Sequence, residues 1–312
     1  MTRGAIDIGT NAVLLLIAAE EAGRFREVAD FSTITRLGEG LLKTRRLSEE
    51  AMERTIAALE KYRMALDAHH GHIACAFGTS ALRESENRQE FIETVHRRTG
   101  FHVKVFSEYE EAYYTYLSVN RDPAILGGDL IVVDIGGGST EITRGTRERF
   151  IDYVSLPVGT VKLTELFVKH DPPAPAELEG LARFVRELLP GKGTLGDCTV
   201  VGMAGTMTTL AAIVLGLEGF QKERIHGLSI SLSTLDEWVG RLSGMSIAER
   251  SALPGMEPGR EDLLLQGMIL MREIVASLGT DSFVVSTYGA RYGVLYERMQ
   301  RKPSGGRPRV PG

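Results

Sequence analysis

The chain has 312 residues with 43% hydrophobic and 25% charged side chains, which is typical of a soluble globular protein with two domains. Its formal net charge of −5 argues against a nucleic-acid partner, so a polyanionic substrate would need a local basic patch. No apolar run approaches the ~20 residues that span a bilayer, and the start runs directly into a predicted strand with no signal peptide. We therefore expect a cytoplasmic protein without a membrane partner. The oligomeric state stays open, with a homodimer as one alternative.

The first half of the chain predicts a strand-rich start followed by alternating helices and strands. The predicted strands cover residues 4–8, 12–19, 25–34, 73–77 and 101–106. The predicted helices cover residues 48–69, 87–98 and 108–120. Ser48 is a suitable N-cap for the first of these helices, and Gly100 stops the second. A meander followed by alternating helices and strands implies a mixed sheet covered by helices.

The second half restarts near residue 128 in a similar order. Its predicted strands cover residues 130–134, 140–144, 150–155, 198–203 and 282–286. Its predicted helices cover residues 161–169, 176–189, 207–215, 235–242, 260–278 and 291–300. We expect domains at 1–124 and 125–300, with the last helix as a candidate to pack back on the first domain, and a disordered basic tail at 301–312. The two cysteines, Cys75 and Cys198, fall in predicted buried strands, which suits small core residues.

Two apolar strands end in an aspartate that is followed by glycine. The first reads Ala5-Ile-Asp7-Ile-Gly9-Thr-Asn11, and the second, 127 positions later, reads Ile131-Val-Val-Asp134-Ile-Gly-Gly-Gly-Ser-Thr-Glu141. Glycine turns expose backbone N–H groups, which together form an anion site. Because an aspartate would repel the same anion, it is expected either to hold Mg²⁺ through water or to orient a water molecule, which makes Asp7 and Asp134 the Mg²⁺ candidates. The repeat predicts duplicated halves whose phosphate-binding hairpins face each other across a cleft.

Several spaced motifs together resemble a known family. They are Asp7-Ile-Gly-Thr-Asn, Phe77-Gly-Thr-Ser-Ala-Leu-Arg83, Ser107-Glu-Tyr-Glu-Glu-Ala112, Asp134-Ile-Gly-Gly-Gly-Ser-Thr-Glu141, Val201-Gly-Met-Ala-Gly-Thr206 and, more weakly, Ser286-Thr-Tyr-Gly-Ala-Arg-Tyr-Gly-Val-Leu295. The chain resembles the exopolyphosphatase and guanosine pentaphosphate phosphohydrolase family, of the acetate kinase, sugar kinase, heat-shock chaperone and actin superfamily. The resemblance implies an α/β fold of two duplicated ribonuclease H-like (actin-like) domains with an interdomain cleft, in the short two-domain form. It also implies Mg²⁺-dependent hydrolysis of terminal phosphoanhydrides by an attacking water.

The chain departs from the family pattern at two motifs. Glu108 stands where the family usually has glycine, and Tyr113 stands where it has arginine. Late in the chain, Ala290-Arg291-Tyr292-Gly293 replaces the favoured Leu-Arg-Glu-Gly. The first two changes remove a phosphate contact and add negative charge, and they support one alternative, a non-catalytic regulator that binds an alarmone. An ATP-dependent kinase of the same superfamily is the other alternative.

Two adjacent glutamates must be told apart. Ser107-x-x-Glu110 matches the capping box, in which the glutamate folds back onto the N-cap amide. This gives Glu110 a structural task and leaves Glu111 as the free carboxylate in the first turn of its helix. The family resemblance also makes the second glutamate catalytic, so Glu111 is expected to be the general base for the attacking water.

The other candidates complete the expected site. Arg83 ends a strand-to-turn segment, from which its guanidinium would clamp a terminal phosphate, while Glu141 would support the metal or orient water. Residues 201–206 read as a strand, a glycine turn and a helix N-terminus, which is either an anion site or a tight crossover. The expected ligands are Mg²⁺ and either polyphosphate or a guanosine penta- or tetraphosphate. The predicted phosphate-binding residues are Gly9, Thr10, Asn11, Gly136, Gly137, Gly138, Ser139, Gly205 and Thr206.

Overall fold

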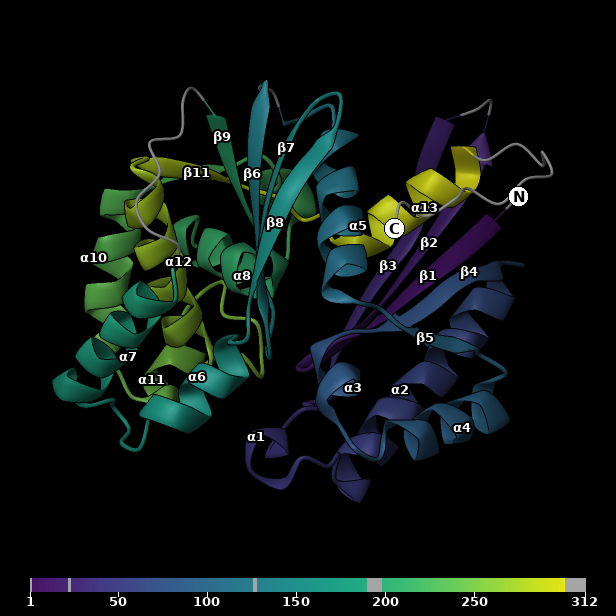
Figure 1. Cartoon of the computed structure of the whole chain (residues 1–312), viewed down its shortest axis with the longest axis horizontal. Coiled ribbons are helices and arrows are strands. Elements are labelled where there is room, and N and C mark those ends of the chain that lie inside the picture. Colours follow the sequence, from purple (N-terminus) through teal and green to yellow (C-terminus); the bar gives the residue numbers. More distant parts are fainter. Residues whose placement is uncertain (1, 22–23, 126–127, 190–197, 301–312) are drawn as a thin grey trace.

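Two mixed β-sheets, each covered by helices, make up the two halves of the protein (Figure 1). The computed structural model describes residues 2–21, 24–125, 128–189 and 198–300. Within this part of the chain, the first sheet has the strand order β3-β2-β1-β4-β5 and the second has the order β10-β11-β9-β6-β7-β8. The strands are Thr2–Ile8 (β1), Ala12–Glu21 (β2), Arg24–Ile34 (β3), His72–Gly78 (β4), Val103–Val105 (β5), Asp129–Ile135 (β6), Thr140–Thr146 (β7), Phe150–Leu156 (β8), Cys198–Met203 (β9), Ser229–Ser231 (β10) and Ser282–Val285 (β11).

The helices of the first half are Leu41–Thr44 (α1), Glu49–Ala68 (α2), Ser80–Glu84 (α3), Arg88–Thr99 (α4) and Glu108–Asn120 (α5). Those of the second half are Thr160–Phe167 (α6), Pro175–Leu188 (α7), Ala204–Val214 (α8), Lys222–Ile225 (α9), Leu232–Ser243 (α10), Ile247–Ser251 (α11), Leu264–Leu278 (α12) and Ala290–Gln300 (α13). Every predicted helix and strand is present; the ends of α5 and β9 are as predicted, and those of the others are shifted. The sequence missed the short elements α1, α3, α9, α11 and β10, because pieces this short show no periodicity.

The two halves repeat the same sheet topology, which confirms the predicted duplication and fold class. In each half, three strands form an antiparallel meander, and the next strand pairs in parallel with the first strand of that meander. The register places Asp7 opposite Leu14 on β2 and Asp134 opposite Glu141 on β7. Both aspartates therefore end the central strand of their sheet, and only the second one faces another carboxylate across the strands.

The last helix of each half packs on the sheet of the other half. Helix α5 lies against β6, β7 and β8, while α13 lies against β1, β2 and β4, and the two helices pack against each other (Figure 1). Successive residues of the central strands pack on opposite faces of the sheet: Ile6 joins the core under α2, whereas Ala5 packs with Tyr292 and Leu295 of α13. Burial on both faces explains why these strands read as continuous apolar runs.

A close approach between α5 and α13 requires glycine. A β-carbon built at Gly293 would lie 1.9 Å from the carbonyl oxygen of Tyr114, which is backbone and cannot yield without moving a helix. We expect Gly293→Ala to lower stability by about 2 kcal/mol or more through this overpacking. Urea unfolding of the two proteins measures the effect, with Gly240→Ala as the control, since a β-carbon there meets nothing within 4 Å. Equal midpoints for Gly293→Ala and wild type would contradict the expected clash.

Three further expectations differ in their outcome. Cys75 and Cys198 lie in the predicted strands but are only half-buried, because Cys198 opens its strand and Cys75 packs at the edge of the α13 core. The domain limits 1–124 and 125–300 remain a prediction, and the tail 301–312 lies outside the described residues. Among the described helices, none combines the length and apolarity that crossing a membrane requires.

Candidate active site

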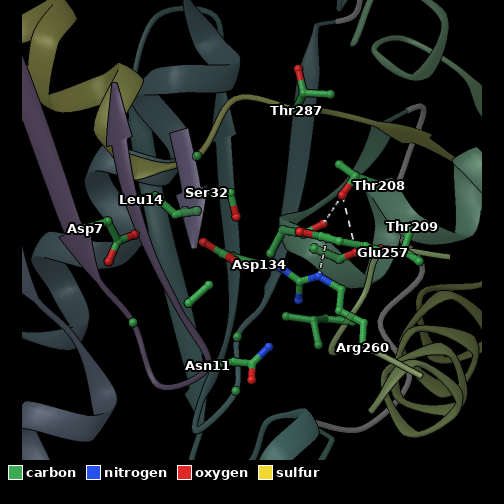
Figure 2. A pocket seen from close by; sticks show the side chains of 18 of the residues that line it. Asp7, Asn11, Leu14, Ser32, Asp134, Thr208, Thr209, Glu257, Arg260 and Thr287 are labelled. Atoms are coloured by element: carbon green, nitrogen blue, oxygen red, sulfur yellow. Dashed lines mark hydrogen bonds and ion pairs between the residues drawn. The ribbon is translucent and has the colours of Figure 1, made fainter. Parts of the chain in front are cut away.

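A cavity of about 740 Å³ lies between the two halves (Figure 2), within the usual size range of ligand sites. Most of the predicted site lines it. The predicted residues on its wall are Asp7, Gly9, Thr10, Asn11, Glu111, Asp134, Gly136, Gly137, Gly138, Ser139 and Gly205. Arg83 and Glu141 are not on the wall; Arg83 contacts Glu111, which is, and lies 3.9 Å from Glu141. Thr206 is also off the wall, because it packs against Gly267 of α12.

The two hairpins have the same hydrogen-bond pattern. In each, the first glycine donates its N–H to the carbonyl three residues later: Gly9 to Ala12 at 3.0 Å and Gly136 to Ser139 at 3.1 Å. In the described part of the chain, the N–H groups of the two residues in between have no protein acceptor, and these residues line the cavity. Both hairpins therefore present unpaired backbone donors to a ligand, as an anion site requires.

Neighbouring segments hold the hairpins in this orientation by occupying their carbonyl groups. The N–H of Gly38 donates to the carbonyl of Thr10, and the N–H of Val161, in the first turn of α6, donates to the carbonyl of Gly137, both at 2.9 Å. A β-carbon built at Gly137 would lie 2.9 Å from Cβ of Thr10. The two hairpins thus touch across the cavity, and glycine is needed where they meet.

Arg83 joins residues from both halves beside the cavity. Its Nη1 atom lies 2.6 Å from Oε2 of Glu111, and its Nη2 atom donates to Oγ of Ser139 at 3.3 Å. The same Nη2 atom lies 3.9 Å from Oε1 of Glu141, which also accepts a hydrogen bond from Ser155. The candidate base, the candidate clamp and the second hairpin are therefore in one contact network, although Arg83 and Glu141 lie far apart in sequence.

Electrostatics tune the candidate base to neutral pH. Burial raises the pKa of Glu111 to about 7, Arg83 lowers it, and Asp134 and Glu108 raise it. Burial also raises the pKa of Glu141 well above its usual range, and the charge of Glu111 adds to this shift. A carboxylate with a pKa near the working pH is suited to general base catalysis.

The two adjacent glutamates differ in structure as the sequence indicated. Ser107 Oγ accepts a hydrogen bond from the N–H of Glu110 at 3.2 Å, and the Glu110 carboxylate accepts one from the N–H of Ser107 at 3.1 Å. The capping box is therefore confirmed. Lys104 pairs with Glu110 as well, so only Glu111 points to the cavity.

The two aspartates are partly buried, and in the described part of the chain neither has a positive partner in hydrogen-bond contact. Burial raises the pKa of Asp7 to about 8, with a further increase from Glu111 and a decrease from Arg291. Burial raises the pKa of Asp134 to about 6, while a hydrogen bond from Thr115 lowers it. Oδ1 of Asp7 is buried with no hydrogen-bond partner in the described part of the chain. Both carboxylates are thus poorly compensated by the protein itself.

This arrangement fits a divalent cation held jointly by protein and substrate. Among the described residues, no three His, Cys, Asp or Glu side chains come close enough to hold a metal by themselves. Mg²⁺ usually binds through one or two carboxylates and completes its shell with water and substrate phosphates. Asp7 and Asp134, beside hairpins with free N–H groups, match that donor set.

The buried charge of Asp7 gives a prediction about stability. Because the folded-state pKa of about 8 lies above the ordinary value of 3.8, the folded protein binds this proton more tightly and loses stability as pH rises through that window. We expect Asp7→Asn to raise the unfolding temperature of the metal-free protein at pH 8 by ~5 °C. The gain should shrink towards pH 4. Thermal unfolding with a chelator measures both.

The control for this stability prediction is a second aspartate on the same cavity wall. Asp30 pairs with the buried Arg291, so Asp30→Asn should lower the unfolding temperature by leaving that guanidinium uncompensated. An Asp7→Asn protein that is no more stable than wild type at pH 8 would contradict the prediction.

Sequence reasoning missed Arg260, which occupies the second-half wall of the cavity. Figure 2 shows it beside Glu257, to which its Nε atom is paired. Its guanidinium lies over Gly205 at the start of α8, where a β-carbon would fall 1.9 Å from Cζ. No protein acceptor contacts its two terminal nitrogens in the described part of the chain. Only the preceding Pro-Gly turn, at 258–259, could have drawn attention to it.

Sequence reasoning also missed a group of charged residues that closes the end of the cavity near α13. Arg291 is buried and pairs with Asp30 of β3. Lys222 of α9 pairs with Glu27 of β3 and donates to the hydroxyl of Tyr292 at 2.7 Å. The sequence placed Arg291 and Tyr292 only in a weak motif, in which Tyr292 departs from the family pattern and Arg291 matches it. Their role in joining the halves depends on partners that pattern alone does not reveal.

The departure at Tyr113 lies away from the cavity. Its ring packs near those of Tyr109, Tyr114 and Phe150, in the seam between α5 and β8, and it does not line the cavity. Glu108 acts at longer range, by raising the pKa of Glu111.

Known proteins resemble the chain over almost its whole length. The profile of the Ppx/GppA phosphatase family matches residues 16–302. Exopolyphosphatase 2 from Mycobacterium tuberculosis is 36% identical over 307 residues, covering 93% of this chain and 96% of that protein. A Ppx/GppA family member from Aquifex aeolicus aligns with a TM-score of 0.80 at 32% identity, covering 98% of this chain and 99% of that one. An exopolyphosphatase from Cytophaga hutchinsonii aligns with a TM-score of 0.87 at 28% identity, covering 96% and 98% respectively.

These similarities confirm the resemblance drawn from the spaced motifs. The family profile includes the second hairpin, the second sheet and both crossing helices. The chain, a hydrolase with two actin-like domains, therefore belongs to the Ppx/GppA phosphatase family.

Proposed function

We propose that this chain is a Mg²⁺-dependent exopolyphosphatase, which releases the terminal phosphate of inorganic polyphosphate. The observation that carries the proposal is Glu111, a buried carboxylate with a pKa near 7 that pairs with Arg83 at the wall of a cavity. Opposite walls of that cavity carry the two hairpins with unpaired N–H groups. The exopolyphosphatases among the similar proteins support the choice of substrate.

Each part of the site has a task in this proposal. The hairpin N–H groups bind the oxygens of the terminal phosphate, and Arg83 contacts the same group from beside Ser139. Asp7 and Asp134 would hold Mg²⁺, which when bound neutralises charge on the phosphate oxygens. Arg260, with its terminal nitrogens unpaired, binds a phosphate further along the chain.

The chemical step is the attack of one water on the terminal phosphorus. Glu111 accepts a proton from that water as the new bond between oxygen and phosphorus forms. The bond from the phosphorus to the bridging oxygen breaks, and its electron pair leaves with the shortened polyphosphate. Arg83 stabilises the charge that spreads over the phosphate oxygens. No covalent bond between enzyme and substrate is needed.

Guanosine pentaphosphate is a second candidate substrate, which one feature of the cavity favours. The wall formed by the second half includes Met256, Pro258 and Phe220, whose side chain is 65% exposed. An apolar wall of this kind suits a base and a sugar better than a chain of phosphates. The regulator alternative is less favoured, because the ion pair of Glu111 and Arg83 is intact and Tyr113 does not line the cavity.

Phosphate release is the direct test of the proposed function. Long-chain polyphosphate and guanosine pentaphosphate are assayed side by side, with Mg²⁺ and with a chelator. We expect release from polyphosphate that stops when the metal is removed, and the ratio of the two rates identifies the preferred substrate. A folded protein that releases phosphate from neither substrate would contradict the proposal, and binding of guanosine tetraphosphate without turnover would favour the regulator.

A further inference from the structure

One face of α5 carries three polar residues at helical spacing, which the proposed mechanism uses only in part. Glu111, Thr115 and Ser118 lie at positions i, i+4 and i+7. Glu111 pairs with Arg83. Thr115 is fully buried, and its hydroxyl donates to Oδ2 of Asp134 at 3.2 Å. The same helix therefore contacts both the candidate base and a candidate metal ligand, one turn apart.

The contact from Thr115 makes the two aspartates unequal. Asp134 Oδ2 has a hydrogen-bond donor, whereas Oδ1 of Asp7 is buried with no partner in the described part of the chain. Asp134 Oδ1 also accepts no hydrogen bond from the described residues, and Asp134 lines the cavity. One oxygen of Asp134 is thus held by α5, and the other remains available to a ligand.

We infer that Thr115 is a positioning residue for Asp134, whose hydroxyl holds one carboxylate oxygen so that the other is oriented for a divalent cation. The inference rests on the proposed function in taking Asp134 as a metal ligand. A carboxylate bonded at one oxygen loses rotation about its last side-chain bond before the cation arrives, so less freedom is lost on binding. Groups that orient a metal ligand typically change metal affinity or activity by ~10–100-fold when removed.

The contribution of the Thr115 hydroxyl group can be tested by itself. Valine has nearly the same shape as threonine but lacks the hydroxyl, so Thr115→Val leaves the packing of α5 in place and leaves Asp134 Oδ2 without its donor. Thr115→Ser keeps the hydroxyl and loses a methyl group. Ser118→Ala is the matched control, because Ser118 is a buried hydroxyl on the same helix that donates to backbone carbonyls, of Thr115 at 2.7 Å and of Tyr288 at 3.0 Å, and not to Asp134.

The experiment titrates Mn²⁺ into the full-length protein without substrate and measures bound metal by electron paramagnetic resonance. We expect Thr115→Val to weaken Mn²⁺ binding ~10-fold with an unfolding temperature close to that of wild type, and Thr115→Ser to bind nearly as wild type does. Ser118→Ala should lose stability without losing Mn²⁺ affinity. The Mg²⁺ concentration that gives half-maximal phosphate release should rise for Thr115→Val in the same proportion.

Three results would overturn the inference: Thr115→Val binding Mn²⁺ as tightly as wild type, Thr115→Ser binding as weakly as the valine variant, or Asp134→Asn leaving Mn²⁺ binding intact. Failure of the proposed function has a different signature. A wild-type protein whose Mn²⁺ binding depends on Asp134 and on the Thr115 hydroxyl but that releases no phosphate would overturn the exopolyphosphatase assignment and still support the role of Thr115.

Discussion

Replacing Glu111 with glutamine is expected to lower the rate of phosphate release by ~10²–10⁴, the usual contribution of a general base. Glutamine has the same shape and can still accept a hydrogen bond from Arg83, but it cannot take a proton from the attacking water. The side chain of Glu111 is only 12% exposed, so bulk water does not readily replace it. Initial rates on long-chain polyphosphate with saturating Mg²⁺ measure the loss.

The pH dependence of the wild type tests the same assignment. Glu111 must be deprotonated to act as a base, and burial raises its pKa to about 7, so activity should rise with pH through that value. The apparent pKa belongs jointly to Glu111 and Glu141, because the two carboxylates interact. The residual activity of Glu111→Gln should lack this rising limb.

The neighbouring glutamate provides a matched control. Glu110 is bonded to Ser107 in the capping box and paired with Lys104, so Glu110→Gln should change stability by about 1 kcal/mol and leave turnover near that of wild type. Equal losses in the two variants would assign the effect to the helix terminus rather than to a base. A Glu111→Gln protein that is folded and as active as wild type would exclude the mechanism.

Local features of this site could be predicted from the sequence because the chemistry that defines them spans only a few residues. Each hairpin is a strand, an aspartate and a glycine turn within seven to eleven positions. The capping box needs only Ser107 and Glu110. The meander of each half follows from strand lengths and from the rule that sequential strands tend to pair, whereas the parallel pairing of β4 with β1 and of β9 with β6 joins strands that are not consecutive.

The closed end of the cavity could not be predicted, because its contacts join distant positions. Arg291 meets Asp30 across 261 positions, and Lys222 meets Glu27 across 195. Arg260 is positioned by a turn that resembles any other Pro-Gly turn. Charged residues such as these read as a solvated face in sequence, and only the packing of α9, α13 and β3 shows that they are buried together.

The exchange of the last helices explains how one site depends on both halves. Helix α5 crosses to the second sheet, where Glu111 and Thr115 approach Asp134 and Ser139 of the second hairpin. Helix α13 crosses to the first sheet, where the charge of Arg291 lowers the pKa of Asp7. Each aspartate is therefore tuned by a helix from the opposite half, so any change in how the halves pack should alter both aspartates.

Replacing Arg83 with methionine is expected to lower phosphate release by ~10²–10³ at pH 7, the scale of losing one donor to transition-state charge. The loss has two physical origins. Arg83 contacts Glu111 at 2.6 Å and Ser139 at 3.3 Å, which places its guanidinium beside the second hairpin, where the proposed mechanism puts the terminal phosphate. Its charge also lowers the pKa of Glu111, so without it the base is protonated at pH 7 and the rising limb moves to higher pH.

Arg83→Lys separates these two origins, because lysine keeps the charge but not the planar fork of donors. In this variant the rate should still fall, while the rising limb of the pH profile stays close to that of wild type. Arg88→Lys is the control, since Arg88 is exposed and, among the described residues, donates only to the carbonyl of Arg83. If the limb stays in place for Arg83→Met as well, the ion pair does not set the pKa of the base. A rate that also stays within about threefold of wild type would be a smaller change than the loss of one oxyanion donor causes. In that case, Arg83 stabilises the fold beside the cavity and not the reaction inside it.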